Sequence, residues 1–301
     1  MNVAKIFQMT FVFDIKPPRR FSFRHTVRSH GWYDLPPFEH SKGTSELRYV
    51  FQPEGNGNAI SAVISKERWT IKVTLSDKPK DLRRIESGIR HVLRLDDDMA
   101  EFYGALESDE RLSWIADVNA GRLLRSSTVW EDLVKTICTT NCSWALTRKM
   151  VENLVEKLGE PASDGRKSFP TAEAMAAKTE NFYRDEIRAG YRSPYFAELA
   201  ESVAGGKLNV EGWLTSELPT PPLKKELKKV KGVGDYAAEN LLKLIGRFDG
   251  LALDSWLRGQ FYKTHNKGRV CKDKKIEKFY SKFGDWKGLA IWCDMTESWF
   301  K

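Results

Sequence analysis

The sequence is poor in cysteine and shows no arrangement of cysteines that would staple a fold or hold a metal. Its 301 residues contain four, Cys138, Cys142, Cys271 and Cys293, which form no CxxC pair and follow no regular spacing. The pattern does not fit a disulfide framework. Cys138 and Cys142 are four residues apart, which would allow a metal pair on one helix face, but buried free thiols fit the sequence better. We also expect no metal and no other cofactor.

The sequence also lacks a long apolar run. None of its hydrophobic stretches approaches the roughly 20 residues that a membrane-spanning helix requires. The N-terminal stretch MNVAKIFQMTFVFDIKPPRR is interrupted by Lys5, Gln8 and Asp14 and has no small-residue cleavage site. We therefore expect an intracellular, cytoplasmic protein without a membrane partner, associated with the nucleoid if it is bacterial.

Acidic residues are outnumbered by basic ones. The chain has 49 Lys and Arg residues against 41 Asp and Glu residues, which gives a formal net charge of +8. Such an excess favours a polyanionic partner, of which nucleic acid is the commonest. Many basic proteins bind no nucleic acid, so the charge alone does not decide the function.

The N-terminal part of the chain has the alternation of β-strands. In RWTIKVTL (68–75), apolar residues from Trp69 to Leu75 alternate with polar ones, which predicts a strand with one covered face. Further strands are expected at 9–15, 46–52 and 58–65, with a turn at 53–58. Together they predict an antiparallel sheet domain over residues 1–78.

From residue 79 onward the apolar periodicity is helical. Helices are expected at 80–95, 129–138, 144–158, 193–206 and 274–284. The predicted fold class is therefore α+β, with the N-terminal sheet domain (1–78) followed by a mainly α-helical region (79–301).

Two further helical segments, 223–230 and 235–246, are joined by the short link KGVG at 231–234. The two glycines let another molecule approach the main chain, and N–H groups at the start of the second helix favour an anion such as phosphate. The hairpin is surrounded by Lys224, Lys225, Lys228, Lys229 and Lys231. These residues fit either a solvated lysine face or a surface that binds DNA phosphates.

Asp254 stands in GLALDSWLR, between an apolar run and a helical pattern. Aspartate is a preferred N-cap residue, and this role alone would explain its position. A carboxylate held beside a cleft could also stabilise a cation or orient water. The spacing favours the cap and leaves the second role open.

At this point the residues resemble the helix-hairpin-helix (HhH-GPD) DNA glycosylases, whose hairpin is followed by a Gly/Pro-rich loop and an essential aspartate. Gly232, Val233, Gly234 and Asp254 match that motif in type and spacing, while Lys231 replaces a common proline. The resemblance extends to 129–160, 190–203 and 280–295, and less firmly to 21–38. It covers most of the chain and is strongest from about residue 115 onward.

The resemblance also bears on the subtype. Bifunctional members such as 8-oxoguanine glycosylase carry a nucleophilic lysine two residues after the second hairpin glycine, where this chain has Tyr236. Because a phenol cannot form a Schiff base, we expect no AP lyase activity. Alkylpurine glycosylases of the 3-methyladenine type often have an aromatic residue there, which stacks on the flipped base. Cys271 and Cys293 cannot supply the four-cysteine iron–sulfur centre of endonuclease III relatives.

The resemblance implies a set of site residues. Asp254 is expected to be catalytic. Tyr236 is expected to sandwich the base with Trp32 or Tyr33; the alternative is that Tyr236 is a helix-surface or core residue with only a structural role. Asn141 matches the residue that fills the gap left by the extruded base, although it could instead cap the helix that begins near Trp144. DNA contacts are expected at Thr140, Asn141, Lys228, Lys231, Gly232, Val233 and Gly234.

The predicted function is a monofunctional DNA glycosylase, acting as a monomer on a damaged base in double-stranded DNA. Tyr236 resembles the alkylpurine enzymes and favours an alkylated purine, which is electron-poor and gains from contact with aromatic rings. Asn141 is closer to 8-oxoguanine glycosylase and keeps an oxidised base as the alternative. A helix-hairpin-helix protein that binds DNA without chemistry is the alternative of another class, against which Asp254 argues.

Overall fold

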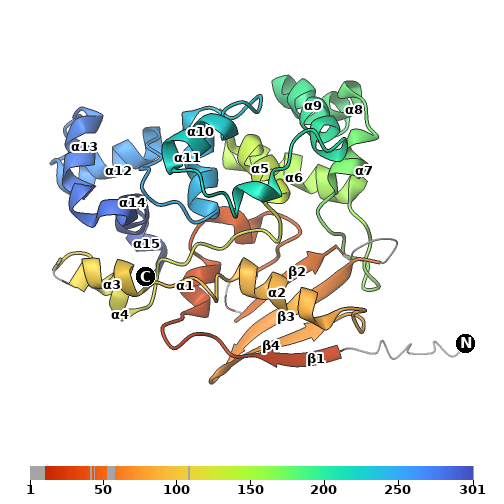
Figure 1. The fold of residues 1–301 in the computed structure, drawn as a ribbon, viewed down its shortest axis with the longest axis horizontal. Helices are drawn as coiled ribbons and strands as arrows, with labels where there is room; N and C mark the ends of the chain where they lie inside the picture. The colour runs from red at the N-terminus through yellow and green to blue at the C-terminus, as the bar shows by residue number, and fades with distance from the viewer. Residues whose placement is uncertain (1–10, 41–42, 44, 53–57, 108, 301) are drawn as a thin grey trace, which may run out of the picture.

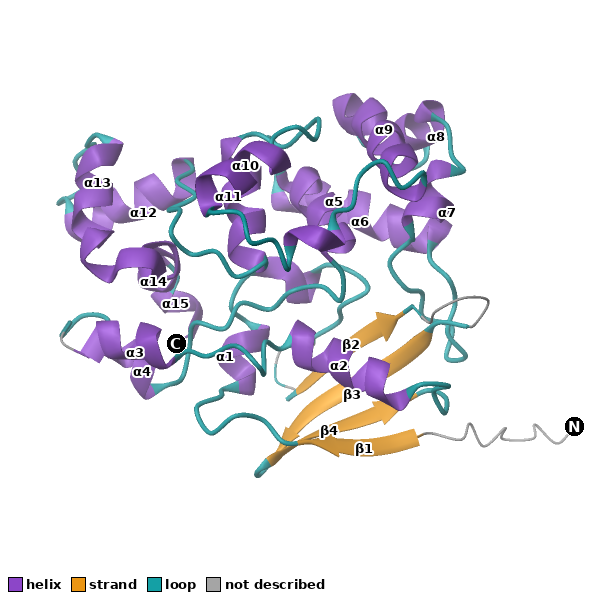
Figure 2. Ribbon diagram, viewed as in Figure 1, coloured by secondary structure: helices purple, strands orange, loops and turns teal. Residues whose placement is uncertain are grey.

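The protein was analysed as a computed structural model, which describes residues 11–40, 43, 45–52, 58–107 and 109–300. A small β-sheet lies at one end of the molecule, and helices form the rest (Figures 1 and 2). This arrangement confirms the predicted α+β fold class. Within the described ranges, no helix has the length and apolar character that crossing a bilayer requires.

The sheet has four antiparallel strands in the order β1-β4-β3-β2. The strands are β1 (Phe11–Ile15), β2 (Glu46–Phe51), β3 (Ile60–Glu67) and β4 (Thr70–Leu75). All four lie where the alternation of the sequence predicted them. The expected turn at 53–58 falls almost entirely outside the described residues, as does the beginning of the first expected strand.

The end of the last predicted strand differs from the expectation. Ile71, Val73 and Leu75 are fully buried, as the alternation predicted, but Trp69 is 86% exposed. The reason is that Glu67 pairs directly with Thr70, so Trp69 lies in the tight turn between β3 and β4, beside Arg68 with its positive φ of 27°. A side chain in a two-residue turn does not share the face of the strand that follows.

Helix α2 (Leu82–Val92) covers the inner face of the sheet (Figure 1). Its apolar stripe is buried in the same cluster of side chains as the strands, and a Cβ on Gly88 would lie 3.0 Å from the Phe51 ring. Asp81 caps the helix by accepting hydrogen bonds from the N–H groups of Arg83 and Arg84.

The remaining elements are helices interrupted by 3₁₀ turns. The longer helices lie in predicted segments, whereas the sequence predicted no helix at Phe23–Val27, Ala100–Glu107, Ser113–Asp117, Ala172–Ala176 or Glu180–Asp185. The α-helices are α1 (Phe23–Val27), α2 (Leu82–Val92), α3 (Ala100–Glu107), α4 (Ser113–Asp117), α5 (Val129–Thr139), α6 (Trp144–Leu158), α7 (Ala172–Ala176), α8 (Glu180–Asp185), α9 (Ser193–Ala204), α10 (Thr220–Leu227), α11 (Asp235–Leu244), α12 (Ser255–His265), α13 (Asp273–Tyr280), α14 (Lys287–Met295) and α15 (Glu297–Phe300). The 3₁₀ helices are η1 (Gly31–Asp34), η2 (Gly190–Arg192), η3 (Glu211–Trp213) and η4 (Ser281–Trp286).

The buried apolar side chains form two large clusters. Cluster 1 joins the sheet to α1, α2 and α5 to α11, with members between residues 15 and 95 and between 124 and 245. Cluster 2 joins α3 and α4 to α12, α13 and α14, with members between 99 and 123 and between 248 and 295. The chain therefore passes from one cluster to the other at 95–99, at 123–124 and at 245–248. The domain boundary after residue 78 stays a prediction.

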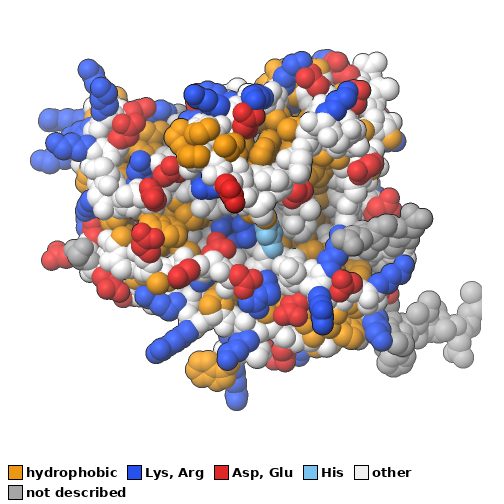
Figure 3. Space-filling view, viewed as in Figure 1, with side chains coloured by type: hydrophobic (Ala, Val, Ile, Leu, Met, Phe, Trp, Pro, Cys, Tyr) orange, Lys and Arg blue, Asp and Glu red, His pale blue; other side chains and the backbone are white. Residues whose placement is uncertain are grey.

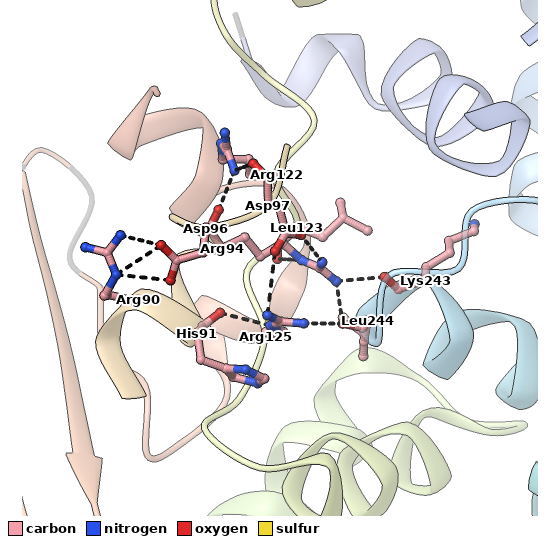
Figure 4. A network of polar contacts seen from close by, with 10 residues as sticks. All are labelled: Arg90, His91, Arg94, Asp96, Asp97, Arg122, Leu123, Arg125, Lys243 and Leu244. Carbon is pink, nitrogen blue, oxygen red and sulfur yellow. Dashed lines mark hydrogen bonds and ion pairs between the residues drawn. The ribbon is translucent and has the colours of Figure 1, made fainter. Parts of the chain in front are cut away.

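A network of buried arginines occupies these crossings (Figure 4). Arg94 is 1% exposed, and its guanidinium donates to the Leu123 carbonyl at 2.8 Å and to the Lys243 carbonyl at 2.8 Å. It also binds the Leu244 carbonyl and forms an ion pair with Asp97 at 2.5 Å. One side chain thus ties together all three places at which the chain changes cluster.

Arg122 and Arg125 extend the network. Arg125 donates to the carbonyl of His91 at 2.9 Å and to that of Leu244 at 3.4 Å, while Arg122 donates to the carbonyl of Asp97 at 2.9 Å. Arg94 and Arg125 therefore bind the last carbonyls of α11, where positive charge also complements the helix dipole.

Candidate active site

A cleft of about 1460 Å³ is lined by η1, the loop between α5 and α6, the α10–α11 hairpin, the start of α12, and residues of α14 and α15. Every residue that the sequence predicted for the site lies on its wall. These residues are Trp32, Tyr33, Thr140, Asn141, Lys228, Lys231, Gly232, Val233, Gly234, Tyr236 and Asp254. The fold thus brings the predicted residues together, and their individual roles stay predictions.

The hairpin turn depends on Gly232. Its φ of 88° lies in the left-handed region that favours glycine, and a Cβ there would lie 2.9 Å from the Tyr195 ring. Gly234 is the N-cap residue of α11, and no side chain caps this helix. Within the described residues the first N–H groups of α11 thus have no side-chain partner, and the binding of an anion there stays a prediction.

The lysines around the hairpin are less free than the sequence suggested. Most of them pair with carboxylates of the same region: Lys224 with Asp235 and Glu239, Lys228 with Asp235, Lys229 with Glu226, and Lys231 with Glu198. These ion pairs partly neutralise the positive charge of the hairpin. Binding of a phosphate here would therefore depend more on the backbone N–H groups than the number of lysines suggested.

Asp254 is half-buried at the N-terminus of α12. Its Oδ1 accepts a hydrogen bond from the Leu257 N–H at 2.7 Å, so the expected N-cap is present. Its Oδ2 has no hydrogen-bond partner within the described part of the chain. One oxygen therefore fixes the carboxylate, and the other remains available to a ligand.

The loop before Asp254 is held by two side chains of α11. Glu239 accepts a hydrogen bond from the Ala252 N–H, and Lys243 donates to the Leu251 carbonyl at 3.3 Å. Ala252 has a φ of 51°, a left-handed conformation that costs an L-residue roughly 1–2 kcal/mol. The two side chains fix a strained segment from which the chain leads directly to Asp254.

One wall of the cleft runs along α11. Tyr236, Asn240 and Lys243 all line the cleft, and their exposure falls from 36% at Tyr236 to 2% at Lys243. Burial raises the pKa of Tyr236 and lowers the pKa of Lys243 to about 8. Neither Asn240 nor Lys243 was predicted to have a role, because LLKLI has the pattern of an ordinary helical segment.

The sequence and the fold were compared with those of known proteins. No family model matches the sequence. A probable N-glycosylase/DNA lyase of Methanothermobacter thermautotrophicus is 22% identical over 306 residues, covering 91% of this chain and 93% of that protein.

Two solved structures are similar over almost the whole chain. The 3-methyladenine DNA glycosylase of Archaeoglobus fulgidus is 19% identical with a TM-score of 0.77, covering 96% of this chain and 99% of that one. The apo form of an 8-oxoguanine glycosylase/lyase from Clostridium acetobutylicum is 20% identical with a TM-score of 0.74, covering 94% and 95%. This chain has the fold of these DNA glycosylases.

The likeness does not separate the two kinds of glycosylase. One of these two proteins is named a 3-methyladenine DNA glycosylase and the other an 8-oxoguanine glycosylase/lyase, and the TM-scores of this chain with the two structures are almost equal. The predicted resemblance to the alkylpurine enzymes in particular therefore stays a prediction.

Within this glycosylase fold, the side of the cleft around α12 is aromatic. Trp256 and Trp299 are 37% and 42% exposed, and the centroids of their rings are 5.5 Å apart. Trp292 lies 5.8 Å from Trp299 and 6.3 Å from Trp256. Sequence reasoning missed Trp292 and Trp299, since no local pattern connects the C-terminal helices with Asp254.

The loop that carries Asn141 is supported by η2. Asn141 has a φ of 47° between α5 and α6, and its amide lies 3.5 Å from the hydroxyl of Tyr191, which is 49% exposed. Arg192 donates to the Ile137 carbonyl at 3.2 Å and to the Thr140 carbonyl. Asn141 precedes the helix but is not its cap, because the side chain of Ser143 caps α6.

The predicted aromatic residues of η1 occupy different environments. Trp32 is only 7% exposed and donates to Asp132 at 2.7 Å, whereas Tyr33 is half-buried and meets the His40 ring edge-on at 5.7 Å. His30 packs on Trp32 at 4.8 Å, and burial lowers its pKa to about 4, so its ring is neutral near pH 7. Trp32 therefore offers the cleft little surface compared with Tyr33.

All four cysteines are free, as the sequence predicted. Cys138 and Cys293 are buried, but Cys142 and Cys271 are partly exposed, so the expectation of buried thiols is right for only two of them. Cys142 lies on the cleft wall beside Asn141 and approaches the Cys138 carbonyl at 2.9 Å.

Proposed function

We propose that this chain is a DNA N-glycosylase, which hydrolyses the bond between a damaged base and its deoxyribose in double-stranded DNA. The observation that carries the proposal is Asp254, a carboxylate fixed through one oxygen and open through the other, in the same cleft as an uncapped helix-hairpin-helix turn. The names of the similar proteins, all glycosylases acting on DNA bases, agree with it.

The substrate would reach the cleft by leaving the duplex. Extruding a nucleotide costs a few kcal/mol, and least for a damaged or mispaired base. The free N–H groups at the start of α11 would bind the backbone phosphate, while Asn141 at the tip of its loop would occupy the vacated stack, with Tyr191 beside it. Tyr236 and the tryptophans around Asp254 would then contact the base.

Bond cleavage would proceed through a cationic sugar. The C1′–N bond breaks with its electron pair leaving on the base, and positive charge develops on C1′ and the ring oxygen. The ionised carboxylate of Asp254 would stabilise that charge and orient a water molecule. The oxygen of this water attacks C1′, and its proton is released.

We further propose that base release is hydrolytic, without cleavage of the strand. Tyr236 stands where a lysine nucleophile would have to act, and its phenol, held protonated by burial and the neighbouring Asp254, cannot form an imine. A similar protein is named an N-glycosylase/DNA lyase, and that second activity would require a different residue in this chain.

Double-stranded DNA, bound by a monomer, is the proposed partner. On the face drawn in Figure 3, acidic and basic side chains are mixed, and Lys and Arg gather most densely at the end that carries α13. Here Lys267, Arg269, Lys272, Lys274 and Lys278 are exposed and form no ion pair with any residue that the structure describes. Their charge supports a general attraction to a polyanion.

A panel of duplexes, each containing one damaged base, would test the proposal by measuring release of the free base. The wild-type protein should release at least one of the bases, and Asp254→Asn should lower the rate by a factor of about 100 or more. Duplex affinity should change little, since the amide oxygen can still cap α12. Full activity of Asp254→Asn would contradict the catalytic role, and DNA binding without release of any base would favour a non-catalytic binding protein.

A further inference from the structure

The face of α11 that lines the cleft leads from the mouth to the floor. Tyr236 and Lys243 are seven residues apart, which is about two helical turns or roughly 10 Å along one face of the helix. The exposure of 36% at Tyr236 and 2% at Lys243 shows the direction of descent. A base that entered along Tyr236 with its sugar at Asp254 would meet Lys243 at its far edge.

The ammonium group of Lys243 has hydrogen-bonding capacity left. It carries three N–H donors, of which one reaches the Leu251 carbonyl at 3.3 Å. The structure records no other hydrogen-bond partner for it among the described residues. On one side lies the face of the Trp292 ring, whose centroid is 5.5 Å from Nζ.

The charge of Lys243 survives its burial. Burial lowers the pKa to about 8, whereas the negative charges of Glu239 and Asp254, and the Cys293 thiol, act to raise it. At pH 7 the protonated form therefore exceeds the neutral form about tenfold. A buried cation with free donors points toward a ligand group that accepts hydrogen bonds.

A second polar atom on the cleft lining also lacks a partner. The Thr136 side chain lines the cleft from α5, which packs against α11, and the residue is 1% exposed. Its Oγ1 forms no hydrogen bond within the described structure. Buried hydroxyl groups are nearly always hydrogen-bonded, so Thr136 Oγ1 is a second unsatisfied polar atom beside the cleft, although its own surface is not exposed there.

We propose that Lys243 reads the far edge of the extruded base and selects a neutral base with a carbonyl oxygen there over a cationic N-alkylated purine. This inference rests on the proposed function. A carbonyl oxygen would accept a charge-assisted hydrogen bond from the ammonium group. A positively charged base would instead be repelled in a cleft where water screens charges poorly.

Lys243 would thereby distinguish between the two substrate classes that the sequence left open. The aromatic residues near Asp254 suit any flat base, since every base has a π face, and so they do not discriminate. The cation at the floor does discriminate, and it favours oxidised or deaminated bases over the alkylated purines that Tyr236 alone had favoured.

The test compares two lesions at about pH 6.5, 8-oxoguanine as the neutral carbonyl base and N7-methylguanine as the cationic base. Lys243→Met removes the charge and the donors at similar length. It should lower release of 8-oxoguanine relative to N7-methylguanine by tenfold or more. Lys243→Arg should keep the wild-type ratio, and Lys263→Met, an exposed lysine on α12, serves as the matched control.

The ratio of 8-oxoguanine release to N7-methylguanine release distinguishes a change in selectivity from a general loss of activity. A general loss of packing in Lys243→Met would lower both rates by the same factor, and an unchanged ratio would overturn the inference. Wild-type protein that prefers the cationic lesion would overturn it as well. If no base is released at all, the proposed function fails, and the affinities of the two lesion duplexes for wild type and variant still test the selectivity of Lys243.

Discussion

At the scale of single residues, Asp254 combines two roles that the sequence presented as alternatives. The hydrogen bond from Leu257 uses one carboxylate oxygen, and the other has no partner among the described residues. An asparagine can accept the same hydrogen bond but carries no negative charge. Asp254→Asn therefore separates the electrostatic role from the cap, whereas alanine would also cost about 1 kcal/mol of helix stability.

Tyr236 leads to a prediction about covalent chemistry. Wild-type protein incubated with borohydride and a duplex containing a damaged base should give no trapped protein–DNA adduct, because a phenol forms no imine. The measurement is a shift in electrophoretic mobility. Tyr236→Lys, which returns an amine to the mouth of the cleft, provides the positive control.

A trapped adduct of the wild-type protein would contradict hydrolytic release. Its loss in Lys243→Met would then identify the buried lysine as the nucleophile, since Lys243 also lines the cleft and has a lowered pKa of about 8. Persistence of the adduct in that variant would point to a lysine elsewhere.

Asp254 and Tyr236 could be predicted from sequence because their signal is local: a short motif and a fixed spacing around one hairpin. Lys243 could not be predicted, because its importance comes from burial. A lysine within an apolar helical segment would be expected to reach solvent, and only the packing of α11 against Trp292 and the 251–254 loop keeps it inside.

At the scale of elements, α11 carries one wall of the cleft and also fixes the loop that ends at Asp254. Glu239 is the direct link, since its carboxylate binds the Ala252 N–H and is paired with Lys224. Misplacement of a reacting group by about 1 Å can lower a rate by a factor of about 100. The position of Asp254 should therefore depend on Glu239.

We expect Glu239→Ala to lower the single-turnover rate of base release by roughly 10-fold to 100-fold while duplex affinity changes less than about twofold. Glu239→Gln keeps an oxygen that can accept from Ala252 and should retain most of the activity. Glu201→Ala, an exposed position on α9, is the matched control. Equal rates for Glu239→Ala and wild type would show that the loop holds its conformation without this contact.

For the hairpin, the sequence predicted the secondary structure correctly but did not predict the ion pairs of its lysines. The two helices and the glycine turn were predicted because proline, glycine and apolar spacing act locally. The ion pairs of the lysines were not, because Glu198 lies in α9 and Glu239 lies farther along α11. Counting lysines in a sequence therefore overestimates the charge that a DNA phosphate would meet.

At the scale of the whole molecule, the buried His30 and the half-buried His91 make stability depend on pH. Burial lowers the pKa of His30 to about 4 and that of His91 to about 3, from an ordinary value of 6.5. Below pH 6.5 the unfolded chain binds protons that the folded chain does not. The stabilisation is thus complete above pH 6.5 and is lost as the pH falls toward 4.

Each histidine should contribute a loss of up to about 1.4 kcal/mol per pH unit in this window. His91→Gln should therefore flatten the fall in the free energy of unfolding between pH 6.5 and 4.5, measured by urea denaturation. Parallel curves for the variant and the wild type would show that His91 is accessible to protons in the folded state. His30→Gln tests the same argument at a second position.

The arginine network has a mechanical consequence. Tyr236 is carried by an element of cluster 1 and Asp254 by one of cluster 2, so the cleft lies along the seam between two separately packed bodies. Arg94 joins these bodies at all three chain crossings (Figure 4). The distance between Tyr236 and the Asp254 carboxylate therefore depends on how Arg94 holds the two bodies together. A substitution remote from the cleft that lets one body tilt against the other would alter the reaction geometry while leaving every cleft residue unchanged.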